Sequence, residues 1–398
     1  MASEEEFVNM GPLNILHLSY DYKESQKSKC TPAVRNLIEI LQTRSINKII
    51  SLHRIAHKFT GDKKLISHDT FRLESFAPPF SIFLKFFLRR TYGQIADICE
   101  KGLINLDETQ FIHTHKSMRE GYIGYLLSKK YNIPLLTSIR MSDFFLLHYR
   151  PDLIPLYREI LNHSQVIFYI MPYMKSQLNK LISSSAYKNI DNKLVFLPNY
   201  INLGINPDNG IKYEKGRLLT VLSMENKKII RRKNIYNIIR AFSQLNHRHL
   251  HLDIIGEGRC IDQVKYWVKK FKVTERVSFL YYIPNNEIYR YYRRAEAFIL
   301  PSHSETFGLV YAESLINNTP ILYSKGTGFD GMFENVGVAV DSKQPGSIIN
   351  GITQILNDNL FYRQTIQDLR SSGAFNIFKS DFILNSYLNA LGKQFINC

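Results

Sequence analysis

The stretch that decides the fold runs over residues 297–316, AFILPSHSETFGLVYAESLI. It opens with a short apolar run over 297–300, which is typical of a buried strand in a parallel sheet. Pro301 ends this strand, a polar turn follows, and from Leu309 the apolar residues recur at helical spacing. The stretch therefore predicts a strand that leads into a helix, and we expect the first turn of that helix to contain Gly308.

Two carboxylates accompany the start of this helix, with Glu305 before it and Glu313 inside it. A helix start carries unpaired N–H groups and a partial positive charge, so that it favours a phosphate group. Eight residues of helix span about 12 Å, and we expect the two carboxylates at that separation. A bare pair of acids at this spacing is more often solvated charge on a surface helix, so that the surrounding string has to decide.

The whole string, strand-Pro-Ser-x-x-Glu-Thr-Phe-Gly-Leu-x-x-x-Glu-Ser-Leu, resembles the Glu-x7-Glu signature of retaining glycosyltransferases with the GT-B fold, above all glycosyltransferase family four. The resemblance implies an α/β fold of two Rossmann-like, doubly wound domains that face a cleft, with a C-terminal helix that crosses back to the first domain. It also implies transfer of a sugar from a nucleotide diphosphate sugar with retention of anomeric configuration.

Strands that alternate with helices along the chain also predict doubly wound parallel sheets, in which ligands bind beyond the carboxyl ends of the strands. The string PNYIN at 198–202 resembles the end of the first domain in the family, and residues 203–215 have the composition of a linker. We therefore expect an N-terminal acceptor-side domain over 12–205 and a C-terminal domain that binds the nucleotide sugar over 216–380. Residues 381–398 are expected to form the crossover helix that packs on the N-terminal domain.

The donor site is expected around Lys233, which stands in the basic loop ENKKIIRRKN where the family has a lysine that grips the donor diphosphate. A lysine suits a diphosphate leaving group as a compact point charge. The alternative is that the segment is a solvated basic loop. The family's nearby arginine is replaced by Ser223 or Met224, and Arg231 or Arg232 is expected to supply that charge. In the family the counterpart of Glu305 holds the donor sugar or balances charge near the anomeric carbon.

The resemblance assigns further donor contacts. The counterpart of Glu313 binds the ribose hydroxyls, and YYIPNNE at 281–287 lies where the family holds the base. The residues expected to bind the donor are Glu313, Thr306, Phe307, Gly308, Leu309, Arg232 and Tyr282. The glycine-rich loop that the family places after its first strand is missing between Ser19 and Pro32, where Lys23, Lys27 and Lys29 offer charge instead.

Acceptor contacts are expected beyond the strands of the first domain. His115 follows the strand predicted at 111–113, and Arg140 and Asp143 follow the strand predicted within IPLLTSI at 133–139. These positions resemble the family's H-x-H and T-x-H/R-G-S-D strings, although Arg140 replaces a histidine. A single histidine in a loop is often structural, and the resemblance is what makes His115 a catalytic candidate beside Glu305 and Lys233.

No cofactor and no metal ion is expected. The chain contains no Asp-x-Asp string that would bridge a metal to a diphosphate, and its four cysteines show no paired spacing. The scattered cysteines suit a reducing compartment. The N-terminus MASEEEF lacks a signal-peptide core and no apolar run is long enough to span a bilayer, so that we expect a cytoplasmic protein.

The net charge of +16 calls for an anionic partner. The string PFSIFLKFFLRRTY at 79–92 mixes aromatic and basic residues as an interfacial amphipathic helix does, and a core helix with a basic edge explains it equally well. An anionic membrane surface is therefore a candidate partner, with peripheral attachment at the inner face. Nucleic acid is not expected, because the aromatic residues fall within strand and helix patterns.

The function expected is that of a retaining, metal-independent hexosyltransferase that moves a hexose from a nucleotide sugar to a glycan or lipid-linked acceptor. The setting expected is assembly of a surface polysaccharide such as lipopolysaccharide, capsule or exopolysaccharide. Three alternatives stay open: a catalytically impaired homologue that acts as a partner subunit, a nucleotide-sugar epimerase, and a phosphorylase with pyridoxal phosphate on a lysine.

Overall fold

The computed structural model describes residues 12–20, 22, 32–54, 63–67, 69–75, 81–182, 189–201, 210–245 and 249–395. The chain divides into two compact units. Unit 1 comprises Met1–Tyr200 and Ser380–Cys398, and unit 2 comprises Ile201–Lys379. Lys23, Lys27 and Lys29, and the first two residues of the 79–92 string, lie outside the described residues.

Unit 1 contains an eight-stranded sheet in the order β3-β4-β2-β1-β5-β6-β7-β8. The strands are β1 (Leu13–Ser19), β2 (Ser45–Arg54), β3 (Lys63–Ser67), β4 (Thr70–Ser75), β5 (Phe111–Thr114), β6 (Leu135–Ile139), β7 (Val166–Tyr169) and β8 (Leu194–Phe196). All neighbouring strands run parallel except β3 and β4. The sequence did not predict the β3–β4 hairpin.

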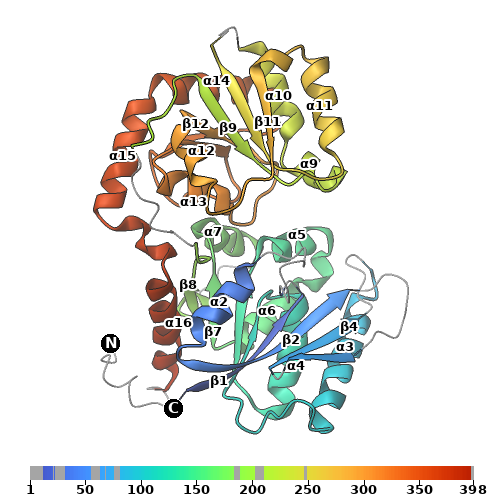
Figure 1. Cartoon of the computed structure of the whole chain (residues 1–398). Helices are drawn as coiled ribbons and strands as arrows, with labels where there is room; N and C mark the ends of the chain where they lie inside the picture. Colours follow the sequence, from blue (N-terminus) through green and yellow to red (C-terminus); the bar gives the residue numbers. More distant parts are fainter. Residues whose placement is uncertain are drawn as a thin grey trace. The chain divides into compact units, whose positions relative to one another are not determined.

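The helices of unit 1 are α2 (Ala33–Leu41), α3 (Leu84–Glu100), α4 (Arg119–Tyr131), α5 (Met141–Tyr149), the 3-10 helix η1 (Pro151–Leu153), α6 (Ile154–His163), α7 (Pro172–Leu181) and α16 (Ser380–Phe395). Figure 1 shows α16 beside α2 and β8. In the sequence, α16 follows the whole of unit 2. Its buried residues Ile383, Tyr387 and Leu391 join a core cluster with Leu13 and Phe168. The last helix therefore completes the core of unit 1.

Unit 2 contains a six-stranded parallel sheet in the order β11-β10-β9-β12-β13-β14. The strands are β9 (Arg217–Val221), β10 (His251–Ile255), β11 (Val277–Tyr281), β12 (Ala297–Ile299), β13 (Ile321–Ser324) and β14 (Gly337–Val340). The helices are α9 (Lys227–Arg232), α10 (Ile235–Gln244), α11 (Ile261–Lys270), α12 (Tyr289–Arg294), α13 (Leu309–Ile316), α14 (Pro345–Asn357) and α15 (Asn359–Ser371), with the 3-10 helices η2 (Thr274–Arg276) and η3 (Ala374–Phe378). Two doubly wound domains are thus confirmed. The prediction of a loop for ENKKIIRRKN is wrong in part, because residues 227–232 form α9.

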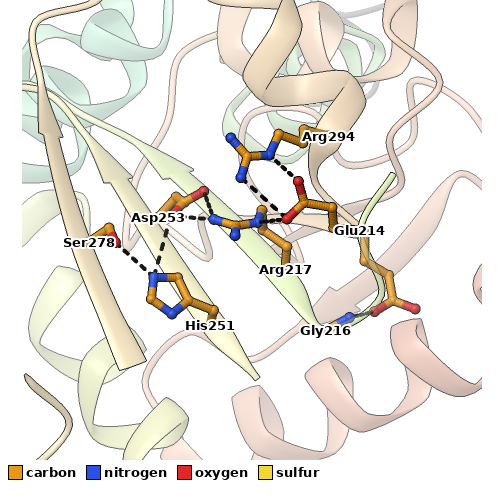
Figure 2. Close-up of polar contacts among 8 residues, drawn as sticks. Glu214, Gly216, Arg217, His251, Asp253, Ser278 and Arg294 are labelled. Atoms are coloured by element: carbon orange, nitrogen blue, oxygen red, sulfur yellow. Dashed lines mark hydrogen bonds and ion pairs between the residues drawn. The ribbon is translucent and has the colours of Figure 1, made fainter. Parts of the chain in front are cut away.

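A polar network stabilises the amino edge of the sheet of unit 2, as Figure 2 shows. Arg217 on β9 donates to both carboxylate oxygens of Asp253 on β10, at 2.9 and 3.1 Å. His251, also on β10, bonds to Ser278 on β11 at 2.8 Å. Glu214 pairs with both Arg217 and Arg294. The network joins three neighbouring strands at the edge opposite the carboxyl ends of the strands.

Among the described residues, no helix has both the length and the apolar content that crossing a bilayer requires.

Candidate functional site

The turns at the carboxyl ends of β9 and β10 in unit 2 are packed backbone against backbone. Gly256 follows β10 with a φ of +133°, and a Cβ there would lie 1.8 Å from the carbonyl oxygen of Leu222. Gly258, with a φ of +143°, would likewise meet the backbone of Met224 at 2.3 Å. The Gly-x-Gly string is therefore required by close packing of the two turns. Met224 is buried and Ser223 is exposed, and because neither side chain carries a charge, neither replaces the family's arginine.

The turn between β12 and α13 agrees with the prediction except at Gly308, which lies directly before the helix instead of in its first turn. Gly308 precedes α13 with a left-handed φ of +81°, and the helix begins at Leu309. Glu305 lies in the turn, so that only Glu313 belongs to the helix. This placement of the two carboxylates is the predicted one, and their separation of about 12 Å stays a prediction. A Cβ on Gly308 would lie 2.3 Å from the ring of Tyr311, which makes glycine necessary here.

The structure brings Lys233 and Glu305 together as an ion pair, although 72 residues separate them. Lys233 directly follows α9, and Glu305 stands in the turn before α13. Their side chains are 14% and 12% exposed, so that the pair is shielded from solvent without being sealed. The backbone N–H of His303 donates to the carbonyl of Arg232 at 2.8 Å, which fixes the two segments against each other. The Lys233 ammonium is thus held by the carboxylate of Glu305, which lies a few residues before the start of α13.

Two residues that the sequence did not identify hold this arrangement in place. The Thr327 hydroxyl accepts from the N–H of Glu305 at 3.0 Å and lies 3.2 Å from the Glu305 carbonyl oxygen, which it can bond as donor. The Asn234 amide, in a left-handed backbone conformation, donates to the carbonyls of Pro301 and Ser342 at 2.9 and 2.7 Å. The signal for Asn234 was its place directly after Lys233, and Thr327 lies in the loop that follows β13.

Glu313 sits on α13, where the Tyr292 hydroxyl from α12 donates to its Oε2 at 2.9 Å. Burial raises the pKa of the Glu313 carboxyl above its ordinary value, and the hydrogen bond from Tyr292 partly opposes that shift. The sequence did not identify Tyr292. An ionised Glu313 here is a carboxylate with little solvent and one oxygen committed to the protein.

The other predicted donor residues fall into three groups. Thr306 and Leu309 flank the start of α13 and are partly buried, while the ring of Phe307 packs edge-on against Phe329 and Phe378. Arg232 is an exposed side chain at the end of α9. Tyr282 is 65% exposed just after β11 and, like Arg232, forms no hydrogen bond or ion pair with Glu305 among the described residues.

Asp143 in unit 1 is a buried clamp. Its Oδ2 accepts from the N–H of Arg140 at 2.9 Å and from the N–H and hydroxyl of Ser117 at 3.2 and 3.0 Å, while Oδ1 accepts from the N–H of Met118 at 3.1 Å. These four bonds lower the pKa of the carboxyl, but burial raises it by more, and the net shift is upward. Both oxygens bind the loops after β5 and β6, so that contact with an acceptor stays a prediction.

Arg140 reaches across the same edge of the sheet. Its Nη1 donates to Asn199 at 3.0 Å and its Nε to the carbonyl of His115 at 3.3 Å. Ser138, Arg140, Asn199 and Tyr200 also border a small pocket in unit 1. Arg140 and His115 are therefore brought together, as expected for one site.

His115 belongs to a cluster with His17 and His113, neither of which is among the predicted site residues. All three are buried, and one nitrogen from each lies within 4.8 Å of the others, a separation at which the three rings could bind one metal ion. Burial lowers the pKa of all three rings, to about 4 for His17, so that they are neutral at pH 7. The parallel pairing of β1 with β5 places His17 opposite His113, and no signal in the sequence shows this pairing.

Together these features describe two kinds of chemistry. In unit 2, a cation and a helix start suit a phosphate group, and a nearby carboxylate suits hydroxyl donors. In unit 1, an imidazole, a guanidinium and an amide lie beyond the carboxyl ends of β5 and β6, where doubly wound sheets bind ligands.

Comparison with known proteins agrees with this geometry. Residues 219–371 match the family described as glycosyl transferases group 1. An uncharacterized glycosyltransferase of Methanocaldococcus jannaschii is 22% identical over 65% of this chain and 68% of its own length. The alpha-monoglucosyldiacylglycerol synthase of Streptococcus pneumoniae is 24% identical over 59% of this chain and 55% of its own.

Among solved structures, sucrose-phosphate synthase from Thermosynechococcus elongatus superposes with a TM-score of 0.71 at 17% identity, over 97% of this chain and 100% of the other. At this identity the likeness concerns the fold alone. The GT-B architecture that the sequence predicted is confirmed.

Proposed function

We propose that this protein, whose residues 219–371 match the family described as glycosyl transferases group 1, is a glycosyltransferase that transfers a hexose from a nucleotide diphosphate sugar to a glycan or lipid-linked acceptor. We propose further that the reaction retains the anomeric configuration and needs no metal ion. The observation that carries the proposal is the Lys233–Glu305 ion pair beside the start of α13.

Each candidate donor-site residue of unit 2 has a role in this proposal. Lys233, with Arg232 nearby, meets the charge that develops on the departing nucleoside diphosphate, aided by the backbone N–H groups around Gly308 and Leu309. Glu305, already oriented by Thr327, holds the donor sugar. Glu313 accepts hydrogen bonds from the ribose hydroxyls through the oxygen that Tyr292 does not use. The exposed ring of Tyr282 contacts the base of the nucleotide.

A lipid-linked acceptor is supported by a patch on unit 1, which we call the α3–α5 patch. Its apolar members are exposed by half or more of their surface: Ile82, Phe83, Phe86, Phe145 and Tyr149. Exposed Lys85, Arg89 and Arg90 stand among them on α3. Arg150, just after α5, donates to the carbonyl of Ser81, which ties the two helices together. The diacylglycerol in the name of the pneumococcal relative points the same way.

We propose that the α3–α5 patch rests on an anionic membrane surface and that the protein works in the cytoplasm at the inner face, in surface polysaccharide assembly. Aromatic rings that enter the interface and basic side chains that meet anionic headgroups are the two features such attachment needs.

The decisive experiment is a thermal shift screen, followed by isothermal titration, of the purified protein against UDP, GDP, ADP and their common sugars. We expect one nucleotide to stabilise the wild type but not Lys233→Ala or Glu313→Ala, which names the base. Lys227→Ala, which removes an exposed charge from the same α9, is the matched control and keeps the response. Loss of the Lys233 charge should lower kcat roughly 10²- to 10³-fold.

Other outcomes decide against the proposal. If no nucleotide stabilises the folded wild type, the protein is instead a catalytically impaired partner subunit. Conversion of the sugar nucleotide without any acceptor indicates an epimerase. A product with inverted anomeric configuration contradicts retention.

A further inference from the structure

The buried histidine cluster of unit 1 is built on two neighbouring strands. His17 on β1 stands opposite His113 on β5, and His115 follows β5 directly. The ring centroids lie 5.5 Å apart for His17 and His113, 5.3 Å for His17 and His115, and 4.3 Å for His113 and His115. Three neutral imidazoles in contact leave the position of each ring proton to the hydrogen bonds around them.

The hydrogen-bond chain begins at Asn47 on β2. The amide nitrogen of Asn47 donates to the backbone carbonyl of Ser45 at 3.3 Å, and a carbonyl only accepts, so that Oδ1 is the atom that faces His17. Oδ1 lies 3.0 Å from His17 Nε2, which must therefore carry the proton. Because His17 is neutral, its Nδ1 carries a lone pair.

The same logic passes on to His115. His17 Nδ1 lies 3.1 Å from His115 Nε2, and a lone pair on the first requires a proton on the second. Because His115 is also neutral, its Nδ1 is left with a lone pair. This Nδ1 is buried and has no hydrogen-bond partner within the part of the chain that the structure describes. Three side chains in series thus leave one buried lone pair without a hydrogen-bond partner among the described residues, on the residue that directly follows β5.

We propose that Asn47 and His17 are positioning residues that hold His115 in the Nε2–H tautomer, so that its Nδ1 accepts a hydrogen bond from a hydroxyl group of the acceptor substrate. The proposal rests on the proposed function for the identity of that hydroxyl. Since Nδ1 is buried, the contact forms in the ligand-bound protein. A hydroxyl that donates to Nδ1 becomes the better nucleophile, which is what sugar transfer requires of the acceptor.

The hydrogen bonds also argue against a shared metal ion. His113 uses both ring nitrogens, with Ser138 at 2.9 Å and Tyr387 at 3.0 Å. His17 uses both as well, so that every nitrogen of the cluster except His115 Nδ1 already has a partner. The cluster is complete without an ion.

The test reads the tautomer directly, by solid-state 15N NMR of the full-length protein labelled on histidine, with His115→Gln to assign the signals. Protonated and unprotonated ring nitrogens give separate shifts. We expect His115 of the wild type to be protonated at Nε2 alone. Asn47→Leu removes the acceptor that fixes His17, so that His115 becomes a mixture of tautomers. Asn47→Asp favours a protonated His17, whose Nδ1–H then moves the proton of His115 to Nδ1.

Ser138→Ala is the matched control, because it removes a buried hydroxyl that contacts His113 but stands outside the chain from Asn47 to His115. Its His115 tautomer should equal that of the wild type. A wild-type His115 protonated at Nδ1, a tautomer unmoved by both Asn47 variants, or one equivalent of Zn²⁺ retained after dialysis would each overturn the proposal. The wild-type spectrum alone decides the first point if a variant fails to fold.

Enzyme kinetics test whether the tautomer of His115 matters for sugar transfer. Asn47→Leu should lower kcat at least roughly tenfold, within the range that a general acid or base contributes, and leave the affinity for the nucleotide unchanged. If the tautomers behave as expected but no transfer occurs, the proposed function fails and the positioning stands. If transfer occurs and Asn47→Leu keeps the wild-type kcat, the positioning role fails and the proposed function stands.

Discussion

The Tyr292 hydroxyl donates to Oε2 of Glu313 at 2.9 Å, from α12 to α13, with the Tyr292 ring fully buried. The bond supplies the carboxylate with one donor in a place where water supplies few. Because the pKa of Glu313 is nevertheless raised by burial, the folded protein holds an ionised group at an energetic cost. Such a cost is expected where a charge serves binding instead of stability.

Glu313→Gln should therefore keep or raise the melting temperature while it removes the nucleotide-induced thermal shift. A carboxyl whose pKa is raised on folding costs stability in its ionised form, so that the advantage of the variant grows from pH 4 to pH 7. Differential scanning calorimetry at both pH values, with and without nucleotide, measures this. Tyr292→Phe, which keeps the carboxylate, should retain a reduced shift; a Glu313→Gln variant that melts well below the wild type at pH 7 contradicts the account.

Acid should destabilise the protein through its buried histidines. Their pKa values are lowered on folding, so that the unfolded chain binds protons more readily as the pH falls below 6.5. For His17, with a pKa of about 4, the stability lost between pH 6.5 and pH 4 is roughly 3 kcal/mol.

Urea denaturation from pH 7 to pH 4.5 should show this loss, with a shallower dependence in His17→Gln. His251→Gln is the control, because His251 is partly exposed and its lowered pKa lies outside the cluster. Equal pH dependence in the wild type and in His17→Gln would remove His17 as a source of acid sensitivity.

Asp143→Asn should destabilise unit 1 by about 2–4 kcal/mol, because the new amide group opposes N–H donors that the carboxylate accepts. Asp152→Asn is the control: Asp152 is exposed in η1, and its change should stay within about 0.5 kcal/mol. Chemical denaturation measures both. An Asp143→Asn variant as stable as the wild type would free Asp143 for a direct role with substrate.

Flotation with anionic liposomes tests the α3–α5 patch. Phe83→Ser with Phe86→Ser should lower binding at least roughly tenfold, since each ring that leaves the interface is worth about 1.5–3 kcal/mol. Leu360→Ser with Phe361→Ser, a pair of equally exposed apolar residues on α15 of unit 2, is the matched control and should bind as the wild type does. Binding of the wild type should weaken with salt; no binding at low salt would exclude the membrane surface.

The sequence predicted the fold because its strands are short apolar runs bounded by turn residues, a pattern that does not depend on distant contacts. The strand predicted at 111–113 forms β5 at Phe111–Thr114, and the run predicted as a strand over 297–300 forms β12 at Ala297–Ile299. The hairpin of β3 and β4 was missed because Lys63–Ser67 is an edge strand with little apolar signal. The helix α9 was missed because KKIIRR reads equally as a charged loop.

The site was predictable only as far as a motif is local. Glu305, Gly308 and Glu313 lie in one string, whereas Thr327 and Tyr292 reach the site through tertiary packing that the sequence does not encode nearby. His17 illustrates the limit best. Its role follows from a pairing with Asn47 and His115 across three strands, and nothing around position 17 marks it.

The return of the chain to unit 1 has a consequence for biosynthesis. Tyr387 and Leu391 on α16 fill the core beside Phe168, yet they are translated after the whole of unit 2. While the ribosome adds residues 201–379, unit 1 therefore lacks part of its interior. The apolar surface that α16 covers in the complete protein stays uncovered during this time. Unit 2 can close first, because its residues are contiguous. The order of completion is thus the reverse of the order in which the two units begin.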